Sequence, residues 1–183
     1  MKKLALHLLL ALTLSSSLAV ADESAYDQGV AAWRAKDYAE ARKQWAQSLA
    51  DGGPDEALNN LAFLLYAGLG GDAQPAKAVE LWRKGAALAI SEAQLHLGQA
   101  YEAGRGVTAN AAQAYAWYQC AIATAARHSA AEPLEEDILK DANKAFAELG
   151  PKLSASERSA GDALAKELIA KYATRLSTEP ATP

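Results

Sequence analysis

Cysteine is nearly absent from this sequence, and its scarcity excludes one way of stabilising a small protein. Cys120 is the only cysteine among 183 residues, so no disulfide can form within the chain. The disulfide-stapled folds of many small secreted domains are therefore excluded. Cys120 lies among apolar residues of a predicted helix, which is typical of a buried small side chain; a reactive or intermolecular thiol is the alternative. The fold must be held together by packing.

Common catalytic and metal-binding patterns are also missing. Only His96 and His128 lie beyond the N-terminal apolar run, and neither has a second ligand at helical spacing. The sequence contains no Ser-x-x-Lys, Gly-x-Ser-x-Gly or His-Glu-x-x-His pattern. The carboxylates at 135–137 fit the start of a helix, where negative charge is favourable, better than an acid–base pair. We therefore predict a protein that is not an enzyme and has no cofactor or metal.

The chain has no excess of basic residues. Lys and Arg number 18 against 22 Asp and Glu, which gives a formal net charge of −4. An acidic chain without a basic patch is a poor match to nucleic acid or to an anionic membrane surface. We therefore predict that nucleic acid is not a partner.

The first 21 residues have the pattern of a signal peptide. Lys2 and Lys3 form a basic head, residues 4–14 are an apolar run, and small residues precede Ala21. A retained membrane anchor is the alternative, but three serines interrupt the run and a span needs about 20 apolar residues. We expect cleavage near Ala21/Asp22 and export to the periplasm or beyond, with no membrane insertion afterwards.

Two segments of the chain repeat each other at an offset of 36 residues without a gap. The aligned pairs are Ala57 and Ala93, Leu61 and Leu97, Gly68 and Gly104, Gly70 and Gly106, Ala78 and Ala114, and Trp82 and Tyr118. Small residues and aromatics at one phase of such a period indicate a helical repeat array. The two Gly-x-Gly sequences fit turns that need positive φ, and neither reaches the full pattern of a phosphate-binding loop.

The predicted fold is all-α: a short α-solenoid of stacked antiparallel helical hairpins, capped by a C-terminal helix. Abundant alanine favours closely packed helices over strands. We expect hairpins at about 23–53, 55–90 and 91–127, then helices at about 134–149 and 155–175. Asp55 and Ser91 are predicted N-caps, and Ser91 forms a capping box with Gln94. Residues 177–183 are predicted to be a disordered tail.

The second unit closely resembles the Sel-1-like repeat family, which is related to tetratricopeptide repeats. The matching residues are Ala93, Leu97, Gly98, Tyr101, Gly104, Gly106, Val107, Ala114, Trp117, Tyr118 and Ala121, while Asn110, Gln113 and Cys120 depart from the pattern. In the first unit the matches are Ala57, Leu61, Gly68, Gly70, Lys77, Ala78, Trp82, Lys84 and Ala86. The resemblance implies stacked hairpins that bind other proteins, and a closing helix like that of exported members. Some exported members have been labelled β-lactamase-like, but no serine–lysine constellation supports that activity here.

In stacked hairpins the first helices line a concave side that binds extended peptides or protein segments. The candidate partner-binding residues on these helices are Asn59, Asn60, Phe63, Tyr66, Leu95, His96, Gln99 and Glu102. The leading hypothesis is an exported scaffold for a protein or peptide partner in the periplasm or envelope. Coverage of these residues by neighbouring helices is the competing interpretation. A peptidoglycan- or glycan-binding module is the alternative function, suggested by Asn59, Asn60 and Gln99, and a hydrolase comes third.

Overall fold

The computed structural model describes residues 24–130 and 132–173. Its α-helices are α1 (Ala25–Arg34), α2 (Tyr38–Ala50), α3 (Glu56–Ala67), α4 (Pro75–Ala87), α5 (Ser91–Ala103), α6 (Ala111–His128), α7 (Pro133–Leu149) and α8 (Ala155–Leu168). A 3-10 turn at Gly150–Lys152 joins α7 to α8, and α8 continues into a π-helical turn at Ile169–Ala173. The described residues include no strand. The predicted signal peptide and the predicted tail lie outside them.

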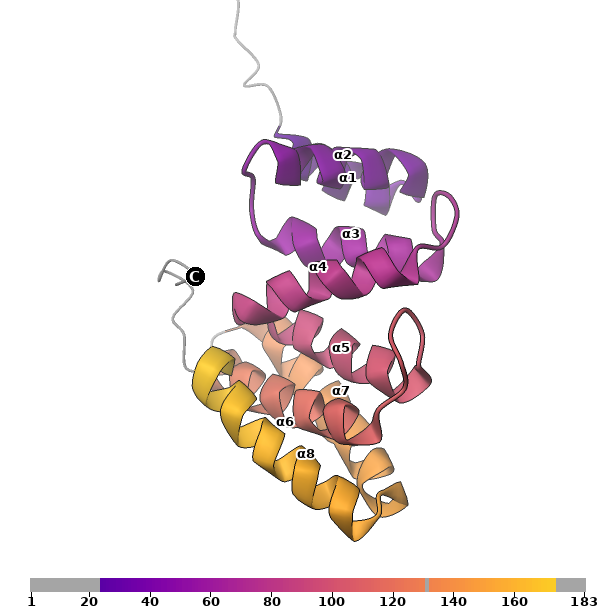
Figure 1. Cartoon of the computed structure of the whole chain (residues 1–183). Helices are drawn as coiled ribbons and strands as arrows, with labels where there is room; N and C mark the ends of the chain where they lie inside the picture. The colour runs from indigo at the N-terminus through magenta and orange to yellow at the C-terminus, as the bar shows by residue number, and fades with distance from the viewer. Residues whose placement is uncertain (1–23, 131, 174–183) are drawn as a thin grey trace, which may run out of the picture.

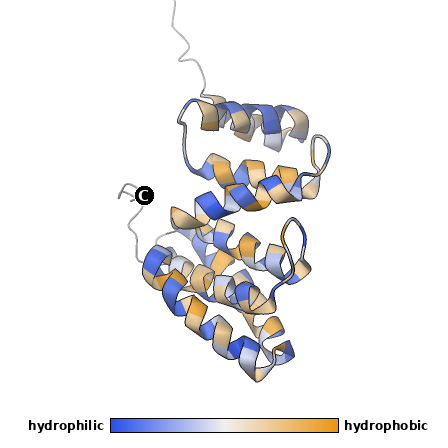
Figure 2. Cartoon of the chain, viewed as in Figure 1, coloured by the Kyte–Doolittle hydropathy of each residue, from blue (hydrophilic) through white to orange (hydrophobic). Residues whose placement is uncertain are grey.

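The helices stack in chain order, from α1 and α2 at one end to α7 and α8 at the other (Figure 1). Each of the helices α1 to α6 contacts the next in the chain, and α6 also contacts α8. Apolar residues, orange in Figure 2, alternate with hydrophilic ones along the helices, and the buried apolar residues form two core clusters. The predicted all-α solenoid is confirmed.

Each Gly-x-Gly turn ends the first helix of a hairpin and packs against the preceding hairpin. Gly68 and Gly104 are left-handed C-caps with φ of 74° and 64°, a conformation that is inexpensive only for glycine. Gly70 and Gly106 also have positive φ. A Cβ atom at Gly106 would overlap the Pro75 carbonyl, and one at Gly70 would overlap the backbone at the start of α2. Each turn therefore packs against the second helix of the preceding hairpin.

Small residues on the first helix of a hairpin make room for an aromatic ring on the second. A Cβ atom at Gly98 would overlap the Tyr118 ring, and one at Gly29 would overlap the Trp45 indole. Tyr118 is almost fully buried in this way, and its hydroxyl donates to Glu102 at 2.7 Å. The repeated glycine and aromatic positions are thus packing devices.

The predicted capping box at the start of α5 is wrong. Helix α5 begins at Ser91 itself, and the Ser91 hydroxyl donates to Glu135 of α7 at 2.7 Å. The Gln94 side chain turns inward, where its Nε2 donates to the Ala86 carbonyl and its Oε1 accepts from the Thr124 hydroxyl. A buried polar group needs a hydrogen-bond partner. The partners of these two side chains lie on other helices, so Ser91 and Gln94 link α5 to its neighbours.

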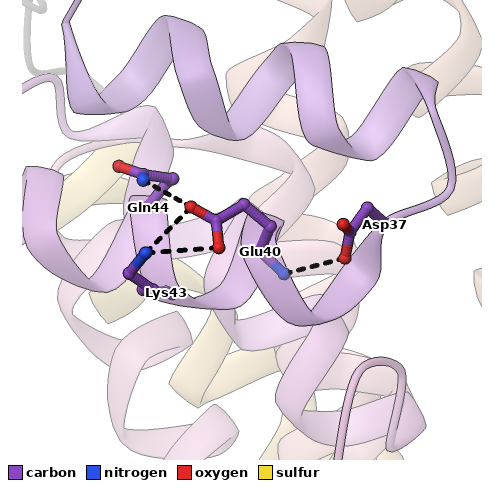
Figure 3. A network of polar contacts seen from close by, with 4 residues as sticks. All are labelled: Asp37, Glu40, Lys43 and Gln44. Carbon is purple, nitrogen blue, oxygen red and sulfur yellow. Dashed lines mark hydrogen bonds and ion pairs between the residues drawn. The ribbon is translucent and has the colours of Figure 1, made fainter.

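Helix α2 begins with a side-chain N-cap formed by Asp37 (Figure 3). The Asp37 carboxylate accepts from the backbone N–H of Glu40 at 3.1 Å. Gln44 and Lys43, one turn further on, donate to the Glu40 carboxylate and hold the pKa of Glu40 below its usual value. These exposed contacts define where the first hairpin turns.

A candidate binding pocket between the first hairpin and the repeats

A pocket of about 410 Å³ lies where the first hairpin meets α3 and α5. Its lining residues are Val30, Trp33 and Arg34 of α1, Trp45 of α2, Asn59, Asn60 and Phe63 of α3, and Glu92 of α5. We call it the α1–α3 pocket. Its volume falls in the range of sites that hold a small molecule or a single protein side chain.

Aromatic side chains form the walls of the α1–α3 pocket. The Trp33 ring lies 6.1 Å from the Trp45 ring and 5.8 Å from the Phe63 ring, measured between centroids. Trp45 is buried against Gly29, whereas Trp33 and Phe63 are each 37% exposed. Large aromatic surface that remains open to solvent beside a cavity is a common feature of recognition sites.

The same aromatic row continues along the array away from the pocket. The Phe63 ring lies 5.9 Å from the His96 ring, and His96 lies 4.8 Å from Trp82. Trp82 in turn lies 4.9 Å from Tyr66. The pocket residues are therefore connected to the core through packed rings, which hold Phe63 in position.

Arginine covers the far end of this row. The Arg105 guanidinium lies 4.4 Å from the centroid of the Tyr66 ring, in cation–π geometry, and also donates to the Tyr66 carbonyl. Burial raises the pKa of Tyr66. Tyr66 is thus shielded by the turn between α5 and α6, while Trp33 and Phe63 are not.

The polar side of the pocket centres on Asn59 and Glu92. The Asn59 amide Nδ2 donates to Glu92 Oε2 at 2.8 Å, which links α3 to α5. Because the carboxylate can only accept, this contact sets the orientation of the amide and directs Oδ1 elsewhere. Among the described residues Asn59 Oδ1 has no hydrogen-bond partner, although Asn59 is only 5% exposed. The other carboxylate oxygen, Oε1, lies 3.7 Å from His96 Nε2.

The predicted partner-binding residues do not form one surface. The pocket brings together Asn59, Asn60 and Phe63, and His96 lies just behind them. Gln99 and Glu102 are exposed but lie outside the pocket lining. Leu95 was expected on the open face, and this is wrong: it is 4% exposed. It belongs to the apolar cluster that also contains Ile138 and Ala142 of α7.

Five of the eight residues that line the pocket are not among the predicted binding residues. Val30, Trp33 and Arg34 belong to the shorter first hairpin, whose phase differs. A signal was present, since aligning Gly29 with Ala62 places Val30 on Phe63 and Trp33 on Tyr66. The alignment therefore predicts that α1 presents Val30 and Trp33 on the same side of the array on which α3 presents Phe63 and Tyr66.

The described residues show little sign of reactive chemistry. No group of three or more His, Cys, Asp or Glu side chains among them could hold a metal ion. Cys120 is buried, and burial raises the pKa of its thiol to about 12, so the thiolate that reacts with oxidants and electrophiles is scarce at neutral pH. None of the helices within 24–130 and 132–173 is both long enough and apolar enough to cross a membrane.

Comparison with known proteins places the repeats in a family. The Sel1 repeat model matches residues 55–89 and 91–123. The crystal structure of c5321, a protective antigen of uropathogenic Escherichia coli with an SLR fold, matches 81% of the chain at 25% identity and a TM-score of 0.69. The chain spans only 30% of the length of that protein.

A Sel1 repeat protein from Oxalobacter formigenes has a similar fold, with 21% identity and a TM-score of 0.53 over 80% of this chain and 69% of that protein. No curated protein sequence matches the chain. The repeat period, the Gly-x-Gly turns and the glycine–aromatic packing agree with these matches. The chain therefore contains two Sel1 repeats and has the α-solenoid fold of Sel1-repeat proteins.

Proposed function

We propose that this chain is an exported scaffold that binds a segment of another protein in the cell envelope, and that the α1–α3 pocket holds the anchor of that segment. Sel1 repeats generally mediate protein interactions. The proposal for the site is carried by one observation: Trp33 and Phe63 stay exposed beside a cavity. Aromatic side chains in such positions dominate binding energy at protein interfaces. Export is supported by the signal-peptide pattern of residues 1–21.

The proposal is tested by cross-linking and pull-down from the native envelope with Trp33→Ala and Phe63→Ala variants. Loss of an aromatic anchor costs at least about 2 kcal/mol of binding free energy, so recovery of the specific partner should fall about 30-fold. Leu134→Ala is the matched control, because Leu134 is an exposed apolar residue of α7. Thermal unfolding of each variant checks that the fold is retained.

Equal recovery with the pocket variants and the control would show that the pocket does not bind the partner. Sedimentation of the chain with peptidoglycan, lost in the same two variants, would favour the glycan-binding alternative instead.

A further inference from the structure

The acidic group that lines the α1–α3 pocket, the Glu92 carboxylate, is a hydrogen-bond acceptor that a ligand can reach. Asn59 Oδ1 has no partner among the described residues, but it is closed to solvent and therefore to a ligand. The Glu92 carboxylate is partly exposed and retains free lone pairs beside its contact with Asn59. The indole N–H of Trp45 is not available to the pocket, because that edge of the ring lies against Gly29. A partly exposed carboxylate favours a ligand that carries positive charge and donates hydrogen bonds.

The aromatic walls also favour a cation. Guanidinium and ammonium groups bind over the faces of Trp and Phe rings because the ring quadrupole is negative there. The chain contains an internal example, since the Arg105 guanidinium already lies 4.4 Å from the Tyr66 centroid. Trp33 corresponds to Tyr66 when α1 is aligned with α3, but it remains 37% exposed.

Charge distinguishes a cation from other occupants. The formal net charge of the chain is −4, or −6 without Lys2 and Lys3, so a basic segment is attracted at long range. Arg34 also lines the pocket, and no acidic group within 24–130 or 132–173 forms an ion pair with it. Arg34 is exposed and solvated, so it weakens cation binding without preventing it, whereas it would strengthen the binding of an anion.

We propose that the α1–α3 pocket binds the cationic side chain of an arginine in a basic segment of the partner. The guanidinium donates to the Glu92 carboxylate and lies against the exposed surface of the Trp33 and Phe63 rings, which contact each other edge to face. Arginine suits the site better than lysine because its planar fork of five donors stacks and donates at the same time. This inference rests on the proposed function, since it specifies what the same pocket recognises.

The test uses two peptides, acetylated and amidated at their ends, that differ at one position: arginine in one and its neutral isostere citrulline in the other. Binding to the purified chain is followed by two-dimensional NMR of the tryptophan indole N–H signals. The arginine peptide should shift the Trp33 signal saturably, and citrulline should bind about tenfold or more weakly, the effect of losing a charge-assisted contact. The Trp117 signal, which comes from α6, is the internal control.

Three variants extend the test. Glu92→Gln keeps an oxygen to accept from Asn59 but removes the charge, so it should weaken the arginine peptide about tenfold or more. Glu80→Gln removes the same charge from an exposed site on α4 and should have little effect. Arg34→Ala should tighten binding about two- to fivefold by removing like-charge repulsion.

Equal binding of the two peptides, or weaker binding by Arg34→Ala, would overturn the inference and point to a neutral or anionic occupant. The proposed function is judged separately by partner capture. If capture depends on Trp33 and Phe63 while citrulline binds as well as arginine, only the inference fails. If neither peptide shifts Trp33 and capture ignores the pocket, both fail.

Discussion

The two Sel1 repeats have the same backbone phase, but their first helices face different surroundings. Asn59 in the first repeat and Leu95 in the second occupy equivalent positions, 36 residues apart. Asn59 borders a pocket and donates to a carboxylate, while Leu95 lies in an apolar cluster with Ile138 of α7. The difference lies in the next helix of the stack. A repeat position borders a polar pocket or joins an apolar cluster according to what packs beyond it, and the repeat itself does not decide this.

The largest expected effect comes from giving the second repeat the residue of the first. Leu95→Asn removes a buried leucine and places an amide among apolar side chains, so we expect the free energy of unfolding to fall by about 4 kcal/mol. Urea unfolding at pH 7 measures this change. Leu95→Met is the matched control and should cost less than about 1.5 kcal/mol, because it nearly conserves volume. A loss below about 1 kcal/mol for Leu95→Asn would mean that α7 does not cover this face.

A smaller loss of stability should appear at alkaline pH, because the second repeat contains a buried thiol, Cys120, that has no counterpart in the first repeat. Burial raises the pKa of Cys120 to about 12, against about 8.5 in an unfolded chain; the equivalent residue in the first repeat is the exposed Lys84. Between these values the unfolded chain releases a proton that the folded chain keeps. The free energy of unfolding therefore falls as pH rises above about 8.5, by about 2 kcal/mol at pH 10 from this thiol.

Urea unfolding at pH 8 and pH 10 checks this prediction in the chain and in Cys120→Ala. The variant should lose about 2 kcal/mol less than the parent between the two pH values, because tyrosine and lysine titrations are common to both. Equal losses would show that the thiol is solvated in the folded state.

The smallest expected effect comes from the reciprocal exchange in the first repeat. Asn59→Leu removes an acceptor that has no partner and leaves Glu92 able to contact water, so the free energy of unfolding should change by less than about 1 kcal/mol. Differential scanning calorimetry measures this. Asn59→Asp, of the same shape, should be clearly more destabilising because its charge lies against Glu92. A cost above about 2 kcal/mol for Asn59→Leu would mean that the Asn59–Glu92 contact holds α3 to α5.

Much of the fold could be predicted because its determinants lie close together in the sequence. The glycines at 68 and 104 need a left-handed conformation that other residues rarely adopt, and this requirement is visible in the sequence. The caps were less predictable. Ser91 has the local pattern of a capping box but contacts α7, whereas the box forms at Ser154 and Glu157. A polar side chain can form a hydrogen bond with a residue nearby in the sequence or with one on another helix. Only the tertiary packing determines whether the second partner lies within reach.

Three of the eight residues that line the candidate site could be predicted. Phe63 and Asn59 followed from the phase of α3, but Trp33 and Glu92 reach the pocket from α1 and α5, and their convergence depends on how the hairpins stack. The predicted exposure of Leu95 was wrong for the same reason. Helical periodicity predicts which residues share a face of a helix, but it does not predict whether another helix covers that face.

The sequence by itself determined the all-α repeat architecture, the period, the turns and the pairing of small residues with aromatic rings, because these depend on backbone conformation and local spacing. The tertiary structure alone decided which repeat faces remain open. It buried Leu95 under α7, placed Arg105 over Tyr66, and left Trp33 and Phe63 exposed beside a buried acceptor without a partner. Exposure is a property of the whole stack, since it depends on helices far apart in the chain.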